Sequence, residues 1–364
     1  MGSRMEIVWG PRDVDGKQTT TNIEGYVAGI QWSGANTEAS RTLTFDLLNS
    51  PYDPGAAGDI PKLQMGDVIQ MWIDGGRHFW GHIVDLEQKG EIGTVSVTCK
   101  DLMYNLLQSK LSIKFDGWTP EAIAKNICRR LGLEVGYLVP TGVALDKEYA
   151  TDTAAYNIIM NAYSRASAET GKQYYPIMNG PAFGVCIKGW VEGERRDASG
   201  NVIETFVLKE NEAITASEVK HSASGMVNRT VIYDKYGTQV GYSETKADVE
   251  KYGPYQESVT VSDDSTDGST EGQNKLVGTT KEMTVSIVGD ELLVSGGGVN
   301  IIESITGLSG LFYIKSDSHK WENGIHTTDL TLTLENITEA PEIQYSEPSS
   351  DDADDADGDI GGDA

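Results

Sequence analysis

The chain has 364 residues, of which 38% are hydrophobic and 23% charged, so it can bury the cores of two or three domains. Its formal net charge of −26 disfavours stable binding to nucleic acid or to anionic membranes, which are themselves polyanions. The three cysteines lie far apart and form no CxxC pair, so we expect neither a zinc knuckle nor a disulfide framework. No apolar run has the length of a signal peptide or a membrane span, so we expect no membrane anchor and no export by the general secretory route.

Residues 5–111 are predicted to form a first β-barrel domain. The segment Arg41–Leu48 alternates strictly between apolar and polar residues, as a strand with one buried face does. Asp67–Asp74 is apolar on both faces, which predicts a strand whose two faces are both buried. Strands at this spacing with Gly-rich turns favour a small barrel or sandwich, and Leu102–Ser109 is predicted to be a short helix that closes it.

Residues 112–224 are predicted to form a small α+β insert domain. A helix is expected within 118–135, because Thr119 is a good N-cap residue and Pro120 follows at the first helical position. Gly132 is expected to end it.

A second helix is predicted over Thr153–Ala168, with Asp152 as its cap. Two hairpins follow it in the prediction. One turns at Asn179-Gly180, a strong short-range hairpin signal, and the other at Ser199-Gly200-Asn201.

Residues 225–338 are predicted to form a second β-barrel domain. It starts with a hairpin that turns near Tyr236-Gly237, followed by a short helix over Lys246–Gly253. The polar loop Asp263–Lys275 is expected to lead into a helix around Lys275–Thr280. Alternating strands then complete the domain.

Residues 339–364 form an acidic C-terminal tail. Seven Asp and no Lys or Arg follow Ser350, and the tail lacks the apolar residues that would offset the entropy cost of ordering. We expect it to be disordered. Its segment Ala353–Gly362 resembles part of a calcium-binding loop, but the first and last ligand positions are Ala, so no specific site is expected.

The segment Phe312–Glu335 is predicted to be a closing hairpin with its turn at Glu322-Asn323-Gly324. The three Leu of its second arm are expected to pack inward, and Trp321 to anchor the base of the turn. The predicted structural motif consists of Tyr313, Trp321, Gly324, Leu330, Leu332 and Leu334.

The polar residues of this hairpin raise the question of catalysis. Alternation places Asp317 and His319 on one face with Tyr313 and Lys315. No Ser or Cys in a strained turn lies near them in the sequence, so we expect surface or inter-subunit groups instead of a catalytic pair.

Metal, cofactor and catalytic residues are not expected elsewhere. His78 and His82 are four residues apart, but in a β context this spacing keeps them too far apart to share a metal. The Gly-rich segment Ser295–Ile301 lacks the phosphate-loop pattern and is predicted to be a tight β connection or bulge. The chain is therefore not expected to be an enzyme.

Three stretches together resemble a known family. GLSGLFYIKSDSHKWENGIHTTDLTLTLE looks like the last hairpin of baseplate hub proteins of contractile phage tails, the late control protein D and XkdQ-like group. WGHIVDLEQKG with TVSVTCKDLMYNLLQSKL looks like the close of their first β unit, and KYGPYQESVTVSDD is similar to the approach to their second half. The resemblance covers roughly residues 5–338, and the order and spacing of the motifs carry it.

The resemblance implies a structural hub that assembles as a homotrimer. Each subunit would contribute two tube-like β-barrel domains flanking the insert, so that the ring adapts a six-fold tail tube to a three-fold spike around a central channel. The implied partners are the tail tube protein, the spike protein and baseplate wedge proteins, with a tape measure protein and a LysM-type tail protein as further candidates.

The resemblance also implies a location, the tail baseplate of a virion or of a contractile bacteriocin, assembled in the host bacterial cytoplasm. The sequence does not separate these two particles. Two other functions stay open. A tail-associated cell-wall hydrolase would need a domain with a nucleophile or metal set, and a carbohydrate-binding module would need exposed aromatic platforms.

Overall fold

The structure is a computed structural model that describes residues 4–10, 20–49, 60–88, 93–193, 195–196, 199, 201–204, 206–261, 268–338 and 340. The acidic tail from residue 341, the predicted turn at Gly200 and part of the polar loop before Lys275 lie outside the described residues. The chain divides into two compact units, residues 1–216 with 285–364 and residues 217–284.

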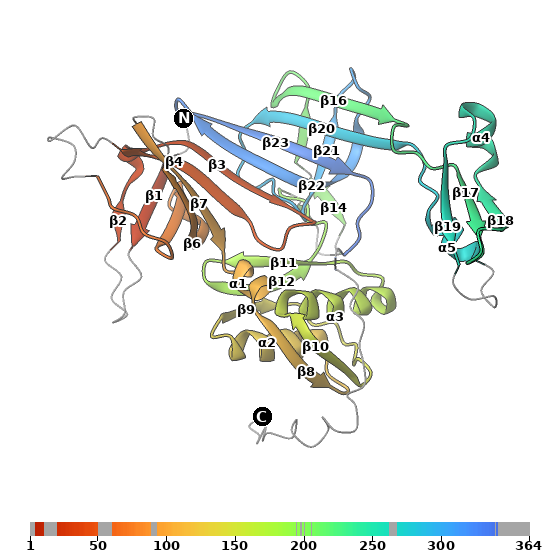
Figure 1. The fold of residues 1–364 in the computed structure, drawn as a ribbon. Coiled ribbons are helices and arrows are strands. Elements are labelled where there is room, and N and C mark those ends of the chain that lie inside the picture. Colours follow the sequence, from red (N-terminus) through yellow and green to blue (C-terminus); the bar gives the residue numbers. More distant parts are fainter. Residues whose placement is uncertain are drawn as a thin grey trace. The chain divides into compact units, whose positions relative to one another are not determined.

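The larger unit is built on one curled antiparallel sheet (Figure 1). Its strand order is β16-β20-β23-β22-β3-β4-β7-β6-β5-β1-β2, and β21 pairs with β22 and, in parallel, with β15. The strands are β1 Met5–Gly10, β2 Thr21–Asn22, β3 Val27–Ala35, β4 Thr42–Asn49, β5 Val68–Ile73, β6 Gly76–Gln88, β7 Gly93–Asp101, β15 Val207–Lys209, β16 Ile214–Ser222, β20 Thr280–Val288, β21 Gly298–Ile302, β22 Ser309–Glu322 and β23 Ile325–Thr333.

The predicted strands of the first β portion are confirmed. In β4 the side chains of Leu43, Phe45 and Leu47 are buried while the residues between them are more exposed. Strand β5 is buried on both faces, as its continuous apolar pattern predicts. The short 3-10 helix η1, Glu24–Tyr26, and helix α1, Met103–Gln108, flank these strands in the chain.

The sheet joins the beginning and the end of the chain. Strand β22 pairs with β3 in antiparallel register from Ser316 opposite Ala35 to Trp321 opposite Ile30. The two β portions therefore form a single curled sheet, and the described residues do not close into two separate barrels as expected from the sequence. Alternation within a strand predicts which face is buried, but it does not identify the neighbouring strand.

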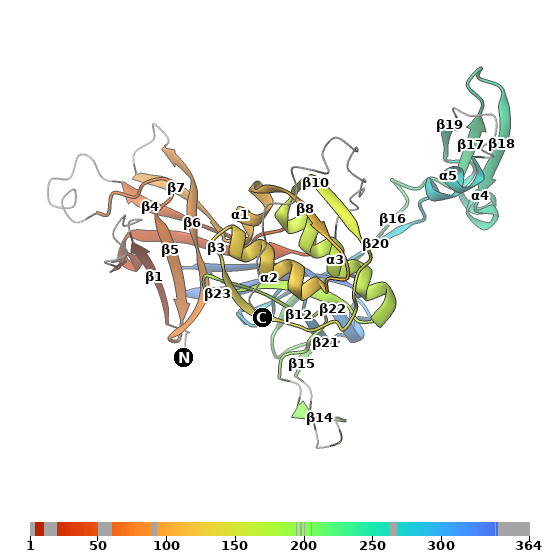
Figure 2. The ribbon, with the colours of Figure 1, turned by 90° about the horizontal axis from the view of Figure 1, so that it is seen from below.

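The α+β elements lie on one side of this sheet, as Figures 1 and 2 show. They form two small sheets, β10-β8 and β11-β12-β9, together with two helices. The elements are β8 Lys110–Phe115, α2 Pro120–Arg130, β9 Glu134–Leu138, β10 Glu148–Ala154, α3 Ala155–Thr170, β11 Tyr174–Asn179 and β12 Ala182–Ile187, followed by the short strands β13 Arg195–Arg196 and β14 Val202–Glu204.

Helix α2 forms for the predicted local reasons. The backbone N–H of Ala122 donates to Thr119 Oγ1 at 3.4 Å, Pro120 is the first helical residue, and Gly132 has a φ of +70° just after the end. The predicted cap of α3 is wrong: the helix begins at Ala155 without a side-chain cap. Asp152 instead pairs with Lys110 at 2.9 Å, and both side chains are exposed.

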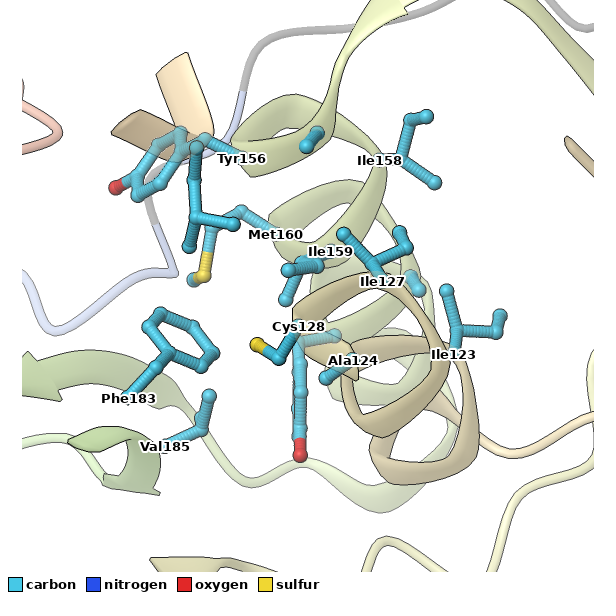
Figure 3. Packing of buried hydrophobic residues seen from close by; sticks show 14 of the residues in the cluster. Ile123, Ala124, Ile127, Cys128, Tyr156, Ile158, Ile159, Met160, Phe183 and Val185 are labelled. Atoms are coloured by element: carbon cyan, nitrogen blue, oxygen red, sulfur yellow. The ribbon is translucent and has the colours of Figure 1, made fainter. Parts of the chain in front are cut away.

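The inner faces of α2 and α3 pack together and against β12 (Figure 3). Ile123 and Ile127 of α2 are fully buried, as are Ile158 and Ile159 of α3 and Phe183 of β12. All of these residues lie between residues 123 and 183, so these core contacts are local in the sequence.

The smaller unit, residues 217–284, has a three-stranded sheet in the order β18-β17-β19. Strands β17 Arg229–Tyr233 and β18 Gln239–Glu244 form the predicted hairpin, and helix α4, Lys246–Tyr252, leads to the parallel strand β19, Gln256–Thr260. Helix α5, Ser269–Asn274, precedes the predicted position around residues 275–280. Across the described residues, no helix is long and apolar enough to cross a membrane.

The closing hairpin differs from its prediction at one residue of its second arm. Asn323 and Gly324 make the turn with φ values of +52° and +76°, and Trp321 is 8% exposed at its base. Leu330 and Leu332 are buried, whereas Leu334 lies beyond the end of β23 and is 61% exposed. Tyr313, on the first arm, is partly buried, and its ring approaches Gly189.

This difference predicts unequal effects of two matched substitutions. We expect Leu332→Ala to lower the free energy of unfolding by about 2–5 kcal/mol, because it removes buried methyl groups and leaves a cavity. Leu334→Ala, two residues away on an exposed side chain, should change it by less than about 0.5 kcal/mol. Urea unfolding followed by circular dichroism measures both, and equal losses would contradict this description of the hairpin.

Candidate functional site

A bulge in β22 turns polar residues into the interior. The pairing of β22 with β23 shifts register between Ile314 and Ser316, so the alternation of faces changes by one residue there. Lys315 is exposed, while Asp317 is 3% and His319 0% exposed. The expectation that Asp317 and His319 are surface groups on the face of Lys315 is therefore wrong.

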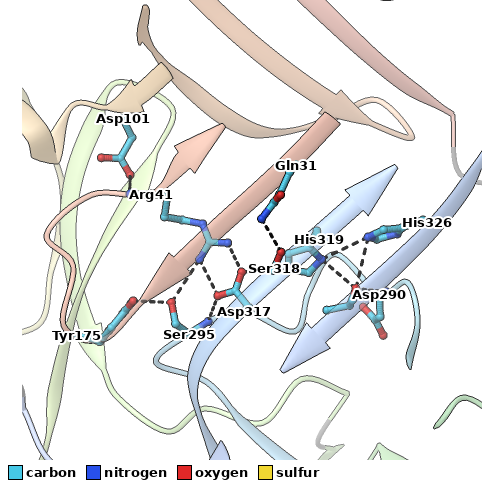
Figure 4. A network of polar contacts seen from close by, with 11 residues as sticks. Gln31, Arg41, Asp101, Tyr175, Asp290, Ser295, Asp317, Ser318, His319 and His326 are labelled. Carbon is cyan, nitrogen blue, oxygen red and sulfur yellow. Dashed lines mark hydrogen bonds and ion pairs between the residues drawn. The ribbon is translucent and has the colours of Figure 1, made fainter. Parts of the chain in front are cut away.

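Asp317 forms a buried ion pair with Arg41, which precedes β4 (Figure 4). Both terminal nitrogens of the guanidinium donate to the carboxylate, Nη1 to Oδ1 at 3.0 Å and Nη2 to Oδ2. The backbone N–H of Ser295 also donates to Asp317 Oδ1, at 2.6 Å. Arg41 lies over the ring of Trp32, with Cζ 3.9 Å from the ring centroid.

The network extends from this pair to two further elements. Ser295 Oγ accepts from Arg41 at 3.3 Å and lies 2.9 Å from the hydroxyl of Tyr175 on β11. At the end of β7, Asp101 accepts the backbone N–H of Arg41 and that of Met103, both at 3.0 Å. The polar contacts thus tie the curled sheet to the α+β elements and to residues 289–297.

The two carboxylates of the network, Asp317 and Asp101, have pKa values that are shifted in opposite directions. For Asp317, burial alone would raise the pKa, but the charge of Arg41 and the side-chain hydrogen bonds hold it well below its usual range. For Asp101, burial dominates and raises the pKa to about 7, although two backbone N–H groups and Arg41 oppose the shift. Burial also raises the pKa of Tyr175 to about 12.

A histidine pair lies on the other side of Asp317. His319 Nε2 is 3.2 Å from Asp317 Oδ2, and His319 Nδ1 is 3.3 Å from His326 Nε2 and 3.1 Å from Thr328 Oγ1. The ring of His326 stacks on Trp321 with centroids 4.1 Å apart. Burial, with a smaller effect of His319, lowers the pKa of His326 to about 4.

This arrangement does not form a catalytic triad. Ser295 Oγ contacts Arg41 and Tyr175, neither of which can serve as its general base near neutral pH. No set of three or more His, Cys, Asp or Glu side chains among the described residues could hold a metal ion. His78 packs against the edge of Trp32, while His82 Nδ1 contacts the carbonyl oxygen of Gly66 at 3.1 Å.

An aromatic cleft of about 260 Å³ opens beside the network. Its walls come from β3, β6, β11 and residues 190–192 and 291–295, and they include Trp32, Arg77, Trp80, Tyr175 and Trp190. The glycine run after Ser295 makes this packing possible. A Cβ atom on Gly296 would lie 2.6 Å from the Tyr175 ring, and one on Gly297 would lie 3.4 Å from Trp190.

Sequence reasoning missed most residues of this site. Arg41, Asp101, Tyr175 and Ser295 are common residue types in unremarkable surroundings, and no motif marks them. The glycine run was correctly predicted to be a tight β connection, since it leads directly into β21. The aromatic rings that it approaches could not be inferred from the run itself.

Three comparisons bear on this fold. A family model described as YQBQ-like matches residues 30–333. The uncharacterized protein YqbQ of Bacillus subtilis (strain 168) is 20% identical over 324 residues, which cover 86% of this chain and 94% of that protein.

Two solved structures share the fold over nearly the whole chain. The 43 kDa tail protein of prophage MuSo2 from Shewanella oneidensis matches with a TM-score of 0.61 at 13% identity, covering 93% of this chain and 100% of its own. The tail protein of Neisseria meningitidis MC58 matches with a TM-score of 0.56 at 14% identity, covering 94% and 100%.

The histidine pair predicts a specific loss of stability in acid. Between the ordinary pKa of 6.5 and the folded value of about 4, the unfolded chain binds a proton on His326 that the folded chain does not. This contribution is fully present above about pH 6.5 and is lost as the pH falls toward 4. Between about pH 7 and about pH 4.5, His326→Gln should therefore lose less stability than the wild type in thermal unfolding.

The contribution of Asp101 has the opposite sign, because its raised pKa makes the folded state bind more protons in this range. It is common to both proteins and cancels in their difference. Parallel stability–pH curves for the wild type and His326→Gln would show that His326 does not carry the effect.

An Ala side chain at Gly296 should have a steric cost, and comparison with a second glycine separates this cost from backbone strain. Gly296 and Gly307 both have positive φ, +87° and +77°, but nothing lies within 4 Å of a Cβ built on Gly307. Both Ala variants should share the backbone strain, and Gly296→Ala should lose about 1–3 kcal/mol more because its methyl group overlaps the Tyr175 ring. Urea midpoints measure the difference, and equal losses would refute the close approach.

Proposed function

This chain belongs to the YQBQ-like family, and we propose that it is a structural protein of a tail baseplate and not an enzyme. The observation that carries the proposal is its fold, which a prophage tail protein and a second tail protein share over more than nine tenths of this chain. The buried polar network agrees with a structural role, because the charges of Arg41 and Asp317 are paired with each other.

More specifically, we propose a homotrimeric hub. Strands β1–β7 and β20–β23 provide two β portions per chain, so three chains would present six and could match a six-fold tail tube above a three-fold spike. The partners would be further copies of this chain, the tail tube protein, the spike protein and baseplate wedge proteins. A tape measure protein and a LysM-type tail protein are further candidates.

The negative charge of the chain would help DNA to pass through a central channel. A wall that conducts DNA should not retain it, and a net charge of −26 repels phosphates at every step. In this proposal the protein is assembled in the bacterial cytoplasm and works in the baseplate of a phage or of a contractile bacteriocin. The acidic tail from residue 339, proposed to be disordered, would add to the negative field.

The mass of the purified protein in solution tests the assembly. Light scattering coupled to size exclusion should give about three times the 39.4 kDa chain mass over a range of concentrations. A trimer should then appear as a ring with an open channel by electron microscopy. A stable dimer or tetramer would contradict the hub, since neither number of chains can present six equivalent β portions.

A further inference from the structure

We propose that the aromatic cleft beside the Arg41–Asp317 pair binds the ring of a neutral saccharide. The cleft is lined by Trp32 of β3, by Arg41 and Asp101, and by residues from β6, from β11 and from 190–192 and 291–295, all within the larger unit. The proposal stands independently of the tail role, because it rests on the lining of the cleft alone.

The size of the cleft favours a small ligand. Its volume of about 260 Å³ lies just below the range of roughly 300–1,000 Å³ that holds a drug-sized molecule. It therefore suits one ring, and a longer chain would have to leave through the mouth, where Leu292 is half exposed. The walls are formed in advance, because glycines let residues 295–297 pack directly on Tyr175 and Trp190.

Two residues that line the cleft carry buried donors that need acceptors. Trp32 is 4% exposed and its Nε1–H has no hydrogen-bond partner, and the Nε–H of Arg41 is also buried and unpaired. A buried donor without an acceptor costs about 1–3 kcal/mol, so such a group calls for an oxygen atom supplied from outside the chain. Both side chains line the cleft, and in this proposal a ligand hydroxyl oxygen accepts from them.

The remaining lining suits a sugar ring. Trp80, Trp190 and Tyr175 offer apolar ring surface, which packs on the C–H faces of a saccharide, and the Tyr175 and Trp190 centroids are 6.0 Å apart. This combination of aromatic surface and a few polar groups is typical of small-molecule sites.

The charges around the cleft argue for a neutral ligand. Arg41, Arg77 and His78 line it together with Asp101, Glu192 and Glu291. An anion would be repelled by the carboxylates and by the net charge of the chain, and a cation by Arg77, since the charge of Arg41 is already paired with Asp317. A polyhydroxylated neutral ring both donates and accepts, so it can satisfy both kinds of group.

The test compares one ring in three charge states on the full-length protein. Saturation-transfer NMR and tryptophan fluorescence titration would measure binding of a panel of neutral sugars (glucose, galactose, N-acetylglucosamine and rhamnose), of glucuronate and of glucosamine. We expect saturable binding of at least one neutral sugar with a Kd below about 50 mM, and at least about tenfold weaker binding of both charged rings. No saturable binding of any neutral sugar, or tighter binding of glucuronate or glucosamine, would overturn the proposal.

Two variants and a control assign the binding to this cleft. Trp190→Ala removes an aromatic wall and Leu292→Trp narrows the mouth of the cleft, so each should raise the Kd for the sugar at least about tenfold. Trp118→Phe alters a tryptophan outside the cleft and should bind as the wild type does. Unchanged binding in both cleft variants would show that the sugar binds to another surface and would contradict the assignment to this cleft. Light scattering of the same samples reports the trimer separately, so failure of one proposal is distinguishable from failure of the other.

Discussion

The larger unit depends on the buried ion pair between Arg41 and Asp317. Removing two charges from water is costly, and the cost is offset only when the geometry is good and the remaining polar atoms are bonded. The geometry is good here, because the contact is two-pronged. The Ser295 N–H and the Trp32 ring complete most of the surroundings, and the Nε–H of Arg41 stays unpaired. Loss of either partner would leave an unpaired buried charge, so the pair fixes one arrangement of β4, β22 and residues 289–297.

Much of the fold follows from local signals in the sequence. The alternation of β4 and the capped start of α2 at Thr119 are each decided within a few residues, and both appear as predicted. The hairpin predicted to turn at Asn179-Gly180 also forms, with its turn one residue later, because Asn179 pairs with Ala182. The errors share another cause. The bulge beside Lys315, the uncapped start of α3 and the union of the two β portions in one sheet depend on distant partners that a local pattern does not contain.

The candidate site could not be predicted from the sequence for the same reason. Arg41 and Asp317 are 276 residues apart, and neither belongs to a motif. A one-residue bulge decides whether Asp317 faces water or the core, because the side-chain period of a strand is two. The sequence contains one sign of the bulge. On the face that strict alternation assigns to Phe312 and Ile314, the residues change from apolar to polar further along the first arm of the hairpin. A bulge that reverses the faces explains the change.

The order of the chain adds a constraint on folding. Strand β3 finds its second neighbour only when β22 arrives, and the contact of Gln31 with Ser318 spans 287 residues. Until then β3 presents an open edge, which is a template for wrong pairing. The α+β core between them is built from local contacts, which form fast, and Asp101 and Tyr175 connect it to Arg41 and Ser295. This core can therefore form first and hold the junction at which the late hairpin docks, which shortens the effective loop that β22 must close.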